Sequence, residues 1–182
     1  MSTGFSPAQL RASLWAKRGA RVHAVVDGMI VPGLPEMLRA AETVGWDCLR
    51  RGALSAEEAE QAAYLAELKE TSPFTDWILG EASATYPGWG VLMISTEPLL
   101  PVRELCRSIG EAVMPDGERR LWRWHDPEVL TVALPIFAAG QLDEIFALQQ
   151  TIVIPASDAW TWLSLAEGVL ATDIRPVLAA SR

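Results

Sequence analysis

The segment WGVLMIS, which runs from Trp89 to Ser95, decides the expected fold. Its middle is continuously apolar, from Val91 to Ile94, with no alternation between apolar and polar residues. This pattern is typical of a strand that is covered on both faces, because an exposed face would carry polar residues at every second position. The segment therefore predicts a buried strand in a sheet that is flanked by helices.

Three more short segments have the composition of strands, and helical patterns lie between them. They are RVHAVVDG (21–28), RRLWRWHD (119–126) and TIVIPAS (151–157), each rich in Val, Ile or Trp and bounded by Gly, Pro, Asp or Ser. Helices are expected over residues 6–19, 34–45, 55–70, 72–83, 99–113, 140–148 and 158–168. Strands separated by helices predict an α/β fold, with a mixed or mainly parallel central sheet of about four short strands flanked by helices. The C-terminal part is expected to be small and helical.

One domain can hold all of these elements. The chain has 182 residues, and half of them are hydrophobic, which allows a sizeable core. We expect an N-terminal helix in residues 1–20 and an α/β core domain in residues 21–139. Residues 140–182 are expected to add a strand and helices that pack on the same domain.

Charge and hydrophobic pattern exclude several classes of protein. The net charge is −8, so the chain lacks the basic surface of a general nucleic-acid binder and is not expected to dock on anionic lipid. The longest apolar stretches are too short to span a bilayer, and the N-terminus has no long apolar run. We therefore expect a cytoplasmic protein in which Cys48 and Cys106 are reduced thiols.

The segment LWRWHDPEVL (121–130) combines several residues that can carry chemistry. If it continues the third predicted strand, Arg123 and His125 share one face, and the two tryptophans share the other. Asp126 ends the strand and can cap the following helix, for which Pro127 fits the first position. The motif thus predicts a switch from strand to helix.

Arg123 needs a partner, because an unpaired buried guanidinium is too costly. Asp27 lies at the end of the first predicted strand, directly before Gly28. If the first and third strands are parallel neighbours, the two side chains come within reach of an ion pair. We hold this pairing as a hypothesis.

Catalytic interpretations have little support in the residues. Asp27 and Asp126 could hold a divalent metal at the end of a sheet, as in several hydrolases, but no histidine array accompanies them. His23 and His125 are both interpreted as strand residues rather than as bases. The chain contains no GxSxG motif, no phosphate-binding loop and no GxGxxG motif after a strand. We therefore predict no catalytic, cofactor-binding or metal site.

Several ordered motifs resemble a known family. HAVVDGMIVPGLPEML is similar to the opening motif of domain of unknown function 4123, and AAYLAELKE is similar to its middle element, with Ala63 where proline is common. The run WGVLMISTEPLLPVRELCRSIGEAVMPDGERRLWRWHDPEVL resembles its most specific part, which ends in Arg-aromatic-x-Asp-Pro. The resemblance covers about Val22 to Leu165. The motif residues in this chain are Asp27, Gly28, Arg123, Asp126 and Pro127.

The resemblance implies an adaptor and chaperone of bacterial type VI secretion. Such proteins bind a toxic effector in the producing cell and assist its loading onto the spike protein, and they are not enzymes. We predict that the motif residues are scaffold residues and that partner contacts lie elsewhere. Two alternatives stay open: a small metal-dependent hydrolase that uses Asp27 and Asp126, and an immunity protein whose acidic charge suits a basic toxin.

Overall fold

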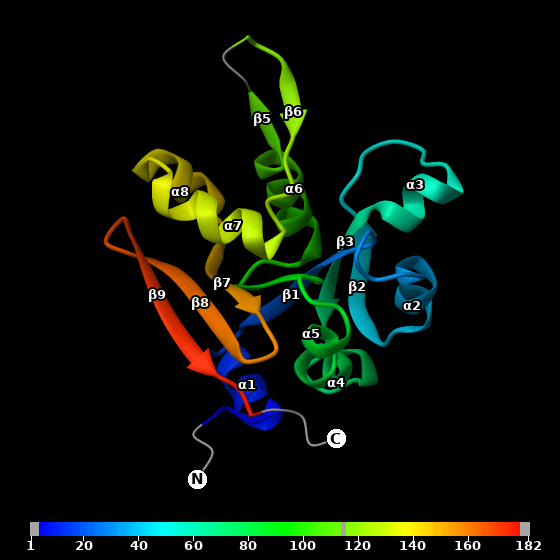
Figure 1. Ribbon diagram of the computed structural model, residues 1–182, viewed down its shortest axis with the longest axis vertical. Coiled ribbons are helices and arrows are strands. Elements are labelled where there is room, and N and C mark those ends of the chain that lie inside the picture. The colour runs from blue at the N-terminus through cyan, green and yellow to red at the C-terminus, as the bar shows by residue number, and fades with distance from the viewer. Residues whose placement is uncertain (1–3, 114–115, 179–182) are drawn as a thin grey trace.

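The fold is built around one large antiparallel sheet, in a computed structural model that describes residues 4–113 and 116–178 (Figure 1). The sheet has seven strands in the order β2-β3-β1-β4-β7-β8-β9, and every neighbouring pair is antiparallel. Their bounds are β1 (Arg21–Asp27), β2 (Thr43–Cys48), β3 (Ala63–Leu68), β4 (Gly90–Ser95), β7 (Gln149–Pro155), β8 (Ala159–Ala166) and β9 (Val169–Pro176). The expectation of a mixed or mainly parallel sheet of about four strands was wrong.

Helices cover both faces of this sheet. One face packs against α1 (Pro7–Leu14), α2 (Leu34–Ala40), α4 (Pro73–Gly80) and α5 (Ala82–Thr85). The other face packs against α6 (Leu99–Ile109), α7 (Pro127–Ala133), the short 3-10 helix η1 (Leu134–Ile136) and α8 (Ala139–Ile145). The short helix α3 (Ala56–Gln61) lies near the β2 edge of the sheet (Figure 1). Among the described residues, no helix is long and apolar enough to cross a membrane.

β4 has the environment that its sequence predicts. Leu92 and Ile94 belong to the core on one face, and Val91 and Met93 belong to the core on the other face. Its neighbours are β1 and β7, so the strand lies in the middle of the sheet. The prediction that WGVLMIS is a strand covered on both faces is therefore confirmed.

The segment 96–148 leaves the sheet after β4 and returns beside it as β7. It contains α6, α7, η1, α8 and a hairpin of β5 (Glu111–Val113) and β6 (Arg119–Leu121). The hairpin projects from the end of α6, away from the large sheet (Figure 1). The predicted strand 119–126 is thus only the short strand β6, which pairs with β5 and not with the large sheet.

Two strands replace parts of predicted helices in the first half of the chain. Residues 34–45 and 55–70 were each expected to be one helix, but these helices end at Ala40 and Gln61, and β2 and β3 follow. The start of the second helix is as predicted, because Ser55 and Glu58 form a capping box. Tyr64 to Leu68 are all buried, since β3 lies between β2 and β1. Pairing on both sides stabilises this strand despite residues that favour helices.

The C-terminal part is a β-meander and not helical, which corrects a second expectation. Residues 158–168 contain all of β8 and a tight turn, and β9 follows from Val169. Trp160 and Trp162 point to one face of the sheet, and Leu163 points to the other, which is the period of a strand. Glu167 and Gly168 both have positive φ, as a two-residue hairpin turn requires.

Candidate functional site

Asp27 is the centre of a buried ionic cluster at the end of β1. Its side chain is 3% exposed, and its Oδ2 atom lies 2.5 Å from Nη2 of Arg123 and 3.2 Å from Nε2 of His125. Its Oδ1 atom accepts a hydrogen bond of 2.8 Å from the amide of Met29. Arg123 Nη2 also lies 3.5 Å from Oδ2 of Asp126. The predicted pair of Asp27 and Arg123 is confirmed.

The hydrogen bonds keep the Asp27 carboxylate charged despite its burial. Burial alone would raise the pKa of Asp27. The hydrogen bonds from His125, the Met29 amide and Arg123 lower it by more than burial raises it, so the net shift is downward. Asp27 therefore acts as a fixed negative charge that holds two side chains from a distant segment of the chain.

Trp124 anchors the segment that places Arg123 and His125 beside this carboxylate. Its indole is buried against α6 and donates a hydrogen bond of 3.1 Å to the carbonyl of Cys106. The residues on either side of it then point away from the helix and toward Asp27. Arg123 and His125 thus lie on the same side, as predicted. The full alternation of faces was wrong, because Asp126, which was expected on the opposite face, also contacts Arg123, and this segment is not a strand parallel to β1.

The two remaining parts of the motif have local structural explanations. Gly28 packs against the backbone at the end of α3, so an added Cβ atom would lie 2.3 Å from the carbonyl oxygen of Glu60. Asp126 caps α7 by accepting a hydrogen bond of 3.0 Å from the amide of Glu128, and Pro127 is the first residue of this helix. The predicted cap is therefore confirmed.

A groove of about 570 Å³ opens beside the cluster. One wall is the segment 49–54 together with α3, and the other is α6 with the start of β5 and the segment after β6. Much of the lining is apolar, including Leu49, Leu54, Ala62, Ala63, Trp122 and Trp124. Met29 and Leu121, at 61% and 73% exposure, stand at its rim.

Four arginines line the same groove, and sequence reasoning had singled out one of them. Besides Arg123 they are Arg50, Arg51 and Arg107. Arg107 holds the wall in place, because it donates to the carbonyls of Cys48 and Leu49. The pair Arg50-Arg51 in LRRG is the sequence signal for this wall, but it lies in a loop without a recognised motif.

The cluster is an ion pair in which two carboxylates share one guanidinium group. The guanidinium of Arg123 contacts both Asp27 and Asp126, so it occupies the place that a divalent metal between these carboxylates would need. Over residues 4–113 and 116–178, no group of three or more His, Cys, Asp or Glu side chains could hold a metal ion. Cys106 lines the groove, but its burial raises the pKa of the thiol well above the ordinary value, so it is not an activated nucleophile. Cys48 is also a free thiol.

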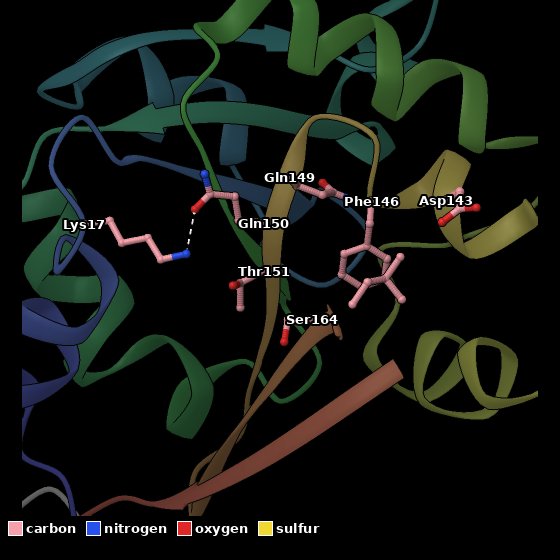
Figure 2. Close-up of a pocket in the computed structure, with 8 residues that line it drawn as sticks. Lys17, Asp143, Phe146, Gln149, Gln150, Thr151 and Ser164 are labelled. Carbon is pink, nitrogen blue, oxygen red and sulfur yellow. Dashed lines mark hydrogen bonds between the residues drawn. The ribbon is translucent and has the colours of Figure 1, made fainter. Parts of the chain in front are cut away.

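A second cavity, of about 490 Å³, lies at the start of β7 (Figure 2). Its lining is mainly polar, and Nζ of Lys17 donates a hydrogen bond of 3.0 Å to Oε1 of Gln150 across one side of it. Phe146 and Asp143 of the α8 region lie on the opposite side (Figure 2). None of the residues that the sequence singled out line this cavity. The groove beside Asp27 is therefore the candidate functional site.

His23 is a second buried ionisable group, on the same strand as Asp27. Its side chain is fully buried, and its Nε2 atom lies 3.7 Å from Oε2 of Glu67. Glu67 in turn binds Arg21 and accepts from the amide of Leu99. Burial, with the nearby charge of Arg21, lowers the pKa of His23 from 6.5 to about 4.

This shift predicts a loss of stability in acid. The unfolded chain binds a proton at His23 below pH 6.5, whereas the folded chain does so only near pH 4, so protonation favours unfolding between these values. The free energy of unfolding should fall by on the order of 3 kcal/mol across this range because of His23 alone. Urea titrations of the parent and of His23→Leu at several pH values measure the effect. The free energy of unfolding of His23→Leu should change less with pH than that of the parent. An equal change in both proteins would contradict the lowered pKa of His23.

Comparison with known proteins gives one match. A family model with the description "Domain of unknown function (DUF4123)" matches residues 22–144, which include the Asp27 cluster and both walls of the groove. The strands β7, β8 and β9 lie beyond the matched residues. No curated protein and no solved structure matches the chain.

Proposed function

Because the chain belongs to the family of domain of unknown function 4123, we propose that it is an adaptor that binds a toxic effector of type VI secretion. In this proposal it acts in the cytoplasm by binding and not by catalysis. It shields the effector before delivery and assists its loading onto the spike protein.

The groove beside Asp27 is the observation that carries the proposal. It lies within the residues that the family model matches, and it combines apolar lining with exposed apolar side chains at its rim. Exposed apolar residues around a concave surface are typical of protein-binding sites. No observation favours the metal-dependent hydrolase, because Arg123 lies where its metal would bind.

Co-expression with a toxin from a gene adjacent to that of this chain tests the proposal. We expect the effector to become soluble and to co-elute with the chain in size-exclusion chromatography, and we expect the spike protein to join or receive the effector from this complex. An effector whose solubility and elution do not change would contradict the proposal. Protection of cells that express the active toxin, without any transfer to the spike, would instead identify an immunity protein.

A further inference from the structure

The charges in the groove differ in sign from those of the whole chain. The chain has 15 basic and 23 acidic residues, whereas the groove is lined by four arginines and three acidic residues, Asp27, Glu58 and Glu111. Each of these acids already has a partner within the chain. Asp27 binds Arg123, Glu58 binds the amide of Ser55 as part of a helix cap, and Glu111 binds Arg119. Because arginines outnumber acids in the lining, a client meets a groove with a small excess of positive charge.

The arginines fall into two groups. Arg107 and Arg123 are held by the chain itself, through backbone carbonyls and through Asp27. Arg50 and Arg51 have side chains that are 45% and 57% exposed, and their nearest acids lie 3.8 Å and 3.2 Å away. Pairs with this exposure contribute little to stability, so these two guanidinium groups can exchange their partners for an external carboxylate at low cost.

The backbone around the groove restricts the form of the occupant. β3, which begins at Ala63 on the floor of the groove, is already paired with both β1 and β2. Neither edge of β3 is therefore open. Within the described residues, β5 and β6 beside the groove are each paired on one side only, but they are only three residues long, so an added strand would find few backbone donors and acceptors. A helix needs only side-chain contacts, and a cavity of about 570 Å³ holds the few apolar anchors that a helix presents at positions i, i+3 or i+4 and i+7.

We infer that the groove binds an amphipathic helix of the effector, with apolar side chains against Met29 and Leu121 and carboxylates against Arg50 and Arg51. This inference rests on the proposed function, and it adds the chemistry of the partner. Glu or Asp must flank the apolar anchors of the bound helix. A helix flanked by Lys or Arg should be rejected by the same guanidinium groups.

Variants of exposed residues test the inference in the complex with the effector. We expect Leu121→Asp and the double variant Arg50→Glu/Arg51→Glu each to weaken effector binding by about tenfold or more, measured by titration calorimetry. Two matched controls change residues that do not line the groove. Ile136→Asp alters a side chain that is 78% exposed, and Arg39→Glu alters one that is 61% exposed. Both should bind within about twofold of the parent.

Designed peptides test the charge preference without the effector. The probe is a fluorescein-labelled Leu/Ala helix of about 18 residues in three versions, whose flanking positions carry Glu, Gln or Lys. The Glu version should bind about tenfold tighter than the Gln version, and the difference should shrink in about 0.5 M sodium chloride. Absent or equal binding of the Glu and Lys versions would overturn the inference. An effector complex whose affinity is unchanged by the groove variants would overturn it too. Failure of any effector complex to form would instead reject the proposed function.

Discussion

Replacement of Arg123 by alanine should lower the free energy of unfolding by about 3 kcal/mol, which is the lower end of the cost of breaking a buried ion pair. The carboxylate of Asp27 is 3% exposed and would keep only His125 and the Met29 amide as partners. The lower end applies because the side chain of Arg123 is itself 43% exposed. Denaturant titration followed by tryptophan fluorescence measures the change.

A double-mutant cycle isolates the pair from the other effects of each substitution. Asp27→Asn removes the charge that Arg123 neutralises, so the double variant should be less destabilised than the sum of the single variants, by about 1–3 kcal/mol. The control is Arg119→Ala, because that side chain is 75% exposed and its loss should cost no more than about 0.5 kcal/mol. If Arg123→Ala melts like the parent and no longer binds the effector, the scaffold role is wrong and Arg123 contacts the client directly.

Gly28→Ala should be as damaging, although it adds only one methyl group. The added Cβ atom would lie 2.3 Å from the carbonyl oxygen of Glu60 and 2.5 Å from that of Ala62, and both are backbone atoms that cannot rotate away. Either the end of β1 or the segment between α3 and β3 must move, and overpacking of this kind costs about 3 kcal/mol. The amide of Gly28 also donates to the carbonyl of Ala62, and this hydrogen bond would be strained.

The glycine at position 140 supplies the control for this prediction. A Cβ atom at Gly140 would meet nothing within 4 Å, and its residue lies in α8, so Gly140→Ala should change stability by no more than about 1 kcal/mol, toward greater stability. Denaturation midpoints of both variants give the comparison. An unchanged midpoint for Gly28→Ala would show that the backbone yields more easily than these distances imply.

Local signals in the sequence predicted some elements correctly and missed others for a physical reason. The cap formed by Asp126 and the burial of β4 depend on neighbouring residues, so they can be read from a short segment. β3 and β8 could not be read in this way. Ala, Leu and Glu in AYLAEL favour a helix, and only pairing with distant strands makes this segment extended.

The candidate site was predictable in part. The pair of Asp27 and Arg123 followed from the cost of an unpaired guanidinium, even though the imagined strand geometry was wrong. The groove was not predictable, because Arg50 and Arg51 belong to a loop whose position depends on Arg107 and on the pairing of β2 with β3. Neither the hydrogen bonds of Arg107 nor the pairing of β2 with β3 leaves a periodic pattern in the sequence.

The segment 96–148, which connects β4 to β7, has a consequence for how related chains can diverge in sequence. Its two ends are anchored on adjacent strands, about 5 Å apart in the hydrogen-bonding direction. Insertions in a loop of this segment cost little free energy, because the entropy of closing a loop grows only with the logarithm of its length. The same segment also supplies one wall of the groove beside Asp27. Under the proposed function, insertions in these loops would change which client binds without altering the large sheet.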